Sequence, residues 1–110
     1  MAYDQELADR LRAELSADPR VTEQAMFGGL AFLVEGAMVV AASGQGGLMV
    51  RCDPARSAEL VAGEGVERMV MRGREVDGWL RVAPDVLDDD AALRDWIAVG
   101  RAATQRLQDR

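Results

Sequence analysis

The chain has 110 residues, of which 49% are hydrophobic and 29% are charged, and its formal net charge is -6 at pH 7. This length suits one domain, 1–110, with a core of its own, and this composition excludes a mainly disordered chain. The sequence has no apolar run near the ~20 residues of a membrane span, no basic and apolar secretory signal, and one cysteine. We therefore expect a cytoplasmic, bacterial protein that does not enter a membrane.

The side chains that the sequence lacks say most about function. It has no histidine, and all 13 basic residues are arginine. Without histidine there is no ordinary general base near pH 7, and without lysine there is neither a Schiff base nor a P-loop lysine. The negative net charge opposes direct binding to a nucleic-acid backbone. We therefore expect a protein that acts by binding rather than as an enzyme, with no cofactor and no metal.

The first segment has the pattern of an amphipathic helix. Leu7, Leu11 and Leu15 recur at every fourth position, and Asp4 is placed to cap the start. Asp18 and Pro19 are expected to end it, because a residue before proline disfavours helical geometry.

Short apolar runs punctuated by glycine follow and predict an antiparallel meander. The candidate strands are 24–27, 30–34, 37–42 and 48–52. Glu35 and Gly36 predict a tight hairpin turn. The glycine-rich run 44–47 resembles a phosphate cradle, but it leads into a strand rather than a helix and no lysine follows, which favours a flexible hairpin loop.

The second half predicts a short helix, a hairpin and a long helix. Asp53 and Pro54 open the short helix, and strands 66–71 and 76–82 follow with a turn at 72–74. Asp88 to Asp90 are expected to cap the last helix rather than bind calcium, because calcium loops space their ligands differently. The buried stripe of that helix is Leu93, Trp96, Ile97, Gly100, Thr104 and Leu107.

A glycine on that buried stripe is unexpected, since Gly100 costs about 1 kcal/mol of helix propensity relative to alanine. It predicts a close approach to another backbone. The whole pattern predicts an α+β fold with the order α-β-β-β-β-α-β-β-α, an antiparallel sheet and helices packed mainly on one face.

The run Met26, Phe27, Gly28, Gly29 is one candidate site. Its two apolar side chains can form an adaptable interaction surface, with the glycines as a loop of close approach. The alternative is a hairpin turn or bulge between two core strands, which strand glycines usually mark.

Clustered arginines on the second hairpin are the other candidate. Arg51, Arg72 and Arg74 form a candidate anion-binding site in an otherwise acidic chain, and with Asp77 they make a small-anion-binding or weakly enzymatic domain the alternative function. The alternative is a solvated ladder of ion pairs, in which the hairpin arginines bind Glu67, Glu75 and Asp77 across strands.

The sulfur-containing side chains are expected to be structural. Cys52 has no histidine to activate it and no cysteine partner, so we expect a small buried hydrophobe. The six methionines can form an adaptable binding surface, but we expect them to fill gaps in a core that has few aromatic residues.

The Met26 to Phe32 run, taken with 3–7, Leu48 to Arg51, and the elements that contain Trp79 and Trp96, resembles the N-terminal domain of the TfoX/Sxy family. The likeness covers almost the whole chain in the same order. It implies a compact α+β domain that often forms a homodimer, in proteins linked to transcriptional or competence regulation. Longer members carry a second, C-terminal helical domain, and this chain is expected to be a stand-alone domain. No catalytic residues follow from the resemblance.

Overall fold

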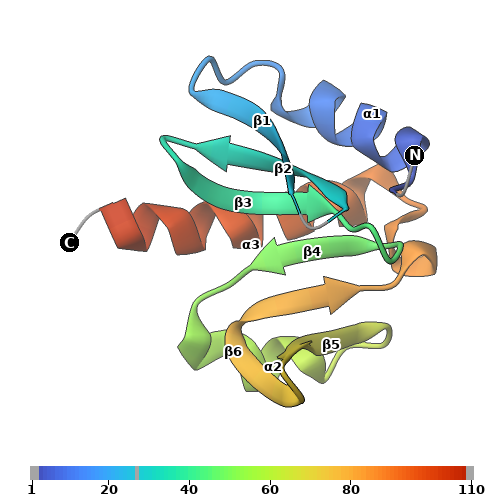
Figure 1. Ribbon diagram of the computed structural model, residues 1–110, viewed down its shortest axis with the longest axis vertical. Helices are drawn as coiled ribbons and strands as arrows, with labels where there is room; N and C mark the ends of the chain where they lie inside the picture. Colours follow the sequence, from blue (N-terminus) through green and yellow to red (C-terminus); the bar gives the residue numbers. More distant parts are fainter. Residues whose placement is uncertain (1–2, 27, 109–110) are drawn as a thin grey trace.

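One antiparallel sheet dominates the computed structural model, which describes residues 3–26 and 28–108 (Figure 1). The sheet has six strands in the order β1-β2-β3-β4-β6-β5, so β1 and β5 are its edges. The bounds are β1 Val21–Met26, β2 Gly29–Val34, β3 Ala37–Ala42, β4 Leu48–Arg51, β5 Val66–Met71 and β6 Arg74–Val82. The first four strands form the predicted meander, and the second hairpin joins it through β6.

The helices complete the predicted α+β order. They are α1 Gln5–Leu15, α2 Ser57–Val61 and α3 Asp90–Gln108, with short 3-10 turns η1 Pro54–Arg56 and η2 Pro84–Leu87 before α2 and α3. The predicted caps are confirmed: a carboxylate oxygen of Asp4 accepts from Glu6 N at 2.9 Å, and one of Asp89 accepts from Ala91 N at 2.9 Å. Within the described ranges, no helix is both long enough and apolar enough to cross a membrane.

Three strand starts differ from the prediction, and that of β2 differs by one residue, at Gly29 rather than Leu30. β1 begins at Val21 rather than Gln24, and β6 begins at Arg74 rather than Val76. The added residues are mostly polar and exposed, yet they pair in register, Glu23 opposite Phe32 for example. Apolar patterning fails at such places because most of the added side chains face solvent, so backbone pairing contributes more than core packing to their place in the sheet.

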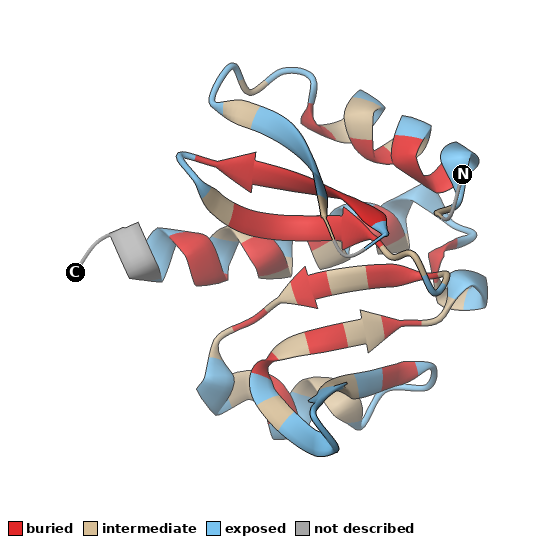
Figure 2. Ribbon diagram, viewed as in Figure 1, coloured by how far each residue is buried: buried red, intermediate tan, exposed pale blue. Residues whose placement is uncertain are grey.

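The main core lies between the helices and one face of the sheet. It joins side chains of α1 and α3 to inward-facing side chains of the central strands, and Figure 2 shows β2 and β3 as the most buried part of the sheet. A smaller cluster adds Leu60 and Val61 of α2 on that same side, through Leu80 and Val66. All three helices therefore cover one face, as predicted, and leave the other without a helix.

Gly100 fixes how closely α3 approaches this face. A Cβ atom at Gly100 would lie 2.5 Å from the carbonyl oxygen of Val39 and 2.8 Å from its Cγ1 atom. Real side chains do not tolerate such distances, so only glycine fits. The predicted close approach is confirmed, and Figure 1 shows the result, with α3 passing behind β3.

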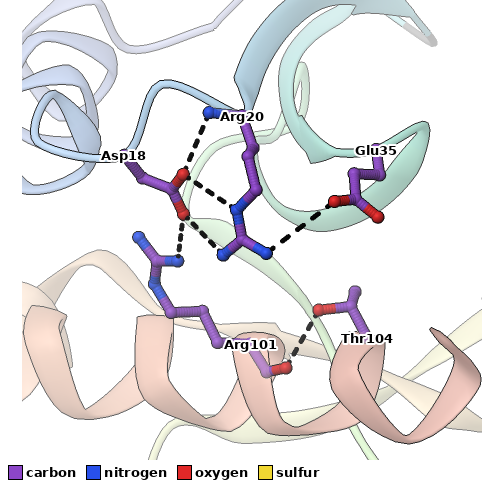
Figure 3. A network of polar contacts seen from close by, with 5 residues as sticks. All are labelled: Asp18, Arg20, Glu35, Arg101 and Thr104. Carbon is purple, nitrogen blue, oxygen red and sulfur yellow. Dashed lines mark hydrogen bonds and ion pairs between the residues drawn. The ribbon is translucent and has the colours of Figure 1, made fainter. Parts of the chain in front are cut away.

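A network of charges ties the loop after α1 to α3 (Figure 3). The Asp18 carboxylate accepts from the Nη2 atom of Arg20 at 3.0 Å and from the Nη1 atom of Arg101 at 2.9 Å. It also accepts from the backbone N–H of Arg20. Hydrogen bonds from Arg20 first, and then from Arg101, hold the pKa of Asp18 well below its usual range. Asp18 therefore stays ionised in the folded protein at acid pH values where it is protonated in the unfolded chain.

Replacing Gly100 tests the helix contact. We expect Gly100→Leu to lower the free energy of unfolding by about 1–3 kcal/mol, because the added atoms overpack the α3–β3 contact. Ala98→Leu, at an exposed position of the same helix, is the control and is expected to change it by less than about 0.5 kcal/mol. Urea denaturation measures both variants. Equal stability of the two would contradict the close approach.

Replacing Asp18 tests the charge network. The folded-state pKa of Asp18 is lowered, so its contribution to stability is present above the unfolded value of about 3.9 and is lost as the pH falls through the folded value. We expect Asp18→Asn to melt at a lower temperature than the parent protein at pH 7, with a difference that shrinks as the pH falls below about 4. Thermal melts across this range check it. Asp95→Asn, at an exposed position of α3, is the control, and a pH-independent difference for Asp18→Asn would refute the explanation.

Candidate functional site

The helix-free face of the sheet carries an apolar cluster of its own. Ala31, Leu33, Met38 and Ala41 are buried there. They alternate with helix-facing side chains along β2, and also along β3 except at Val39 and Val40, which both face the helices where the β2–β3 register shifts. Half-buried side chains from the neighbouring strands pack around them, namely Met26, Met49 and Trp79. The sheet is therefore apolar on both faces, although helices cover only one.

A cavity of about 1060 Å³ lies on this face and draws lining residues from all six strands. We call it the open-face groove. Its apolar lining consists chiefly of Met26, Leu33, Met38, Met49, Met69, Val70, Met71 and Trp79. Val70 and Met71, on the edge strand β5, are the exposed large hydrophobic residues of the described chain, at 60% and 46% exposure. An exposed apolar surface beside a groove is typical of a binding site.

The methionines lie, in part, at a different place in the fold from the one that the sequence predicts. All five in the described ranges line the open-face groove, whereas we expected them to fill gaps in the core. That expectation is confirmed in part, since Met38 is buried in the cluster of the helix-free face and Met26 and Met49 pack against it. None of the three belongs to the helix-covered core, because side chains alternate along a strand. Leu48 and Val50 of β4 face the helices, so Met49 between them faces the groove. Unbranched, polarizable methionine side chains suit a surface that adapts to what it binds.

Arg51 lines this groove from β4, an inner strand of the sheet. Its Nε atom donates to the carbonyl oxygen of Met38 at 3.0 Å, and its guanidinium carbon lies 4.2 Å from the centroid of the Trp79 ring. Partial burial lowers the pKa of Arg51 from its ordinary value. No carboxylate of the described chain forms an ion pair with this guanidinium, so its positive charge is held by a carbonyl and an aromatic face alone.

Three further arginines line the groove. Arg68 forms an ion pair with Asp77 at 2.9 Å, so this step of the predicted ladder is confirmed. Arg81 donates to the neutral oxygens of Gln45 and Gly46, in the loop between β3 and β4. Arg72 stands at the turn between β5 and β6, with a φ of 53°.

The predicted anion-binding residues are thus only partly brought together. Arg51 and Arg72 line the same groove, whereas Arg74 is exposed on the hairpin and is not among the lining residues. Asp77 is engaged by Arg68. Glu67, the acidic residue of the lining, lies opposite Arg81 in the strand register.

The predicted run at 26–29 is placed at the β1–β2 hairpin. Met26 pairs with Gly29 in the register, and Gly28 has a φ of 75° between them, so the hairpin interpretation of the two glycines is confirmed. A Cβ atom at Gly29 would lie 2.3 Å from the carbonyl oxygen of Ala42, which confirms a close approach of backbones. Met26 lines the groove. Phe27 lies outside the described residues, as does the side chain of Leu107.

The other chemical candidates are structural. Cys52 is buried at 2% exposure, and its Sγ atom lies 3.6 Å from the hydroxyl oxygen of Ser57. Asp89 caps α3, as described above. Among the residues that the structure describes, no group of acidic or cysteine side chains is arranged to hold a metal ion.

Comparison with known proteins adds a family to this geometry. The family model of the TfoX N-terminal domain matches residues 13–104, most of the chain. The chain belongs to the TfoX N-terminal domain family. The search of curated proteins found no match, and neither did the search of solved structures. The match to the family model confirms the resemblance that the sequence predicts.

A buried hydroxyl positions the groove residues of this TfoX N-terminal domain. Ser57, at 1% exposure, accepts from the backbone N–H of Gly78 at 3.0 Å, and Cys52 N donates to the carbonyl oxygen of Gly78 at 2.9 Å. Gly78 has a φ of 92°, a conformation that favours glycine. This contact fixes the start of the segment in which Trp79 lies opposite Arg51.

Sequence reasoning missed most of the groove of the TfoX domain. Its signal was present as alternation: Met49 and Arg51, Met69 and Met71, and Trp79 and Arg81 are each two positions apart, which places each pair on one face of a strand. No pattern within one strand shows that these pairs meet on the same side of the sheet. That depends on the strand order, in which β6 lies between β4 and β5.

Removing the Ser57 hydroxyl tests this contact. We expect Ser57→Ala to lower the free energy of unfolding by about 1–3 kcal/mol, because the buried N–H of Gly78 loses its acceptor. Ser16→Ala removes an exposed hydroxyl and is the control, with an expected change below about 0.5 kcal/mol. Denaturant titration measures both. A loss no larger than that of the control would show that the hydroxyl is dispensable.

Proposed function

We propose that this TfoX N-terminal domain is a non-catalytic regulatory module that binds a partner protein in the open-face groove. The observation that carries the proposal is the gathering of five methionines and Trp79 on the helix-free face of the sheet. Family membership supports a regulatory role, since the TfoX family is linked to regulation of competence.

The chemistry of the groove supports binding rather than catalysis. Its lining offers thioethers, aliphatic side chains, an indole ring and guanidinium groups, and arginine holds anions but rarely transfers protons. Among the residues that the structure describes, Glu67 is the one carboxylate of the lining, and no histidine occurs anywhere in the chain. Such a lining can recognise shape, apolar side chains and negative charge.

The shape of the groove favours a protein partner over a small molecule. A sheet of six strands is about 24 Å wide, since neighbouring strands lie about 4.8 Å apart. The groove draws on every strand of this sheet and reaches the exposed edge at Val70 and Met71. An extended peptide of roughly seven residues matches that width, at about 3.3 Å per residue.

The methionines make this proposal testable by photo-crosslinking. Apart from Met1, every methionine of the chain lines the groove, so a photoreactive methionine analogue labels this surface selectively. We expect crosslinks to a partner in cells at the groove methionines. The partner is then purified and its affinity measured by calorimetry. Crosslinks confined to Met1 would refute the proposal.

A matched pair of variants completes the test. Val70→Glu adds a carboxylate to the groove at an exposed position, and we expect it to weaken the partner at least tenfold, or about 1.4 kcal/mol. Ala98→Glu makes the same change of charge at an exposed position of α3, and we expect it to leave the affinity for the partner unchanged. Equal affinity of the purified partner for both variants would show that it binds elsewhere.

A further inference from the structure

Resting on the proposed function, we infer that the groove selects a partner segment that is acidic as well as apolar, with its carboxylate groups bound by Arg51 and Arg72, which both line the groove. The first support is the balance of charge. The groove lining holds four arginines and one glutamate, in a chain whose net charge is -6. The groove lining therefore has an excess of positive charge, although the chain as a whole is acidic.

The ion pairs of the molecule are the second support for this inference. Most arginines outside the groove bind a carboxylate: Arg10, Arg12, Arg20 and Arg101 are examples. Within the groove, Arg68 is paired with Asp77, and Arg81 lies opposite Glu67 and donates to neutral oxygens. No carboxylate in the described ranges pairs with Arg51 or Arg72.

The surroundings of Arg51 favour the binding of an anion. Its side chain is half-buried and held by Met38 and Trp79, so part of its hydration has been removed before anything binds. The contact with Met38 uses only its Nε atom, and no hydrogen bond of Nη1 or Nη2 occurs within the described chain. A partner carboxylate can accept from these groups, and a charge-assisted hydrogen bond at a partly desolvated site is stronger than one in water.

The same charges argue against a second copy of this chain as the occupant. In a symmetric dimer that joined the two grooves, the same surface would meet itself, so a lining with four arginines and one glutamate would face an identical lining. Like charges at such a contact are repulsive, and Glu67 is the one lining carboxylate to offset them. A segment with alternating apolar and acidic residues satisfies both the methionines and the arginines.

Synthetic peptides and methionine-methyl NMR test the inference. The probe is a flexible peptide with two leucines and two glutamates in a glycine-serine background, compared with the same peptide carrying glutamine or arginine in place of glutamate. Methyl-labelled methionine reports on the groove directly. We expect the glutamate peptide to shift the groove methyl signals and to bind at least tenfold tighter than the glutamine peptide, while the arginine peptide binds more weakly still.

Variants of the parent protein locate the carboxylate. Arg51→Gln and Arg72→Gln are each expected to reduce the preference for glutamate over glutamine at least threefold. Arg74→Gln is the matched control, because Arg74 is an exposed arginine of the same hairpin and does not line the groove. An equal effect of all three variants would show that general charge, and not this site, attracts the peptide, and would overturn the inference.

The remaining outcomes separate this inference from the proposed function. Equal binding of the glutamate and glutamine peptides overturns the acidic preference but leaves the groove as a docking surface. If photo-crosslinking finds a partner but no peptide shifts the methyl signals, the acidic preference is again overturned and the groove remains a docking surface. Tighter binding of decanoate than of the glutamate peptide identifies a small amphipathic acid as the occupant, and methyl shifts that follow protein concentration alone identify a second copy. Both overturn the inference.

Discussion

The seating of α3 against the backbone of β3 is the constraint on which the rest of the fold depends. Gly100 permits it, because any side chain there would collide with the carbonyl oxygen of Val39. With α3 this close, α1 and α2 can pack beside it on the same face, and Asp18 can reach Arg101. Placing every helix on one side leaves the opposite face to the groove. The candidate site thus lies on the face opposite Gly100 and the helices.

Much of this architecture could be predicted from the sequence, because its signals are local. The leucine spacing gave α1, the aspartates gave the helix starts, Glu35 and Gly36 gave the hairpin turn, and Gly100 gave the close approach. The strand starts at Val21 and Arg74 were missed, because those segments lack an apolar pattern and are held by backbone pairing at exposed positions.

The groove could not be predicted from local sequence patterns, for a different physical reason. β2 and β3 are buried on both faces, so their sequences do not show which residues face the helices. Arg51 and Arg72 were singled out together, yet only the strand order brings β4, β6 and β5 side by side and their alternate residues to one surface. Arg74 could not be separated from Arg72 by sequence, since both flank Gly73 in the same turn, whereas the hairpin geometry directs just one of them to the groove.

The distribution of sulfur in this molecule has a consequence for oxidative chemistry. The single thiol, Cys52, is buried beneath the helices, while the thioethers line the open groove and reach solvent at Met71. Methionine sulfoxide is polar, and its formation changes a soft apolar contact into a hydrogen-bonding one. Peroxide would therefore alter the surface of the open-face groove before it reached Cys52. Enzymatic reduction of the sulfoxides would restore that surface without refolding the protein.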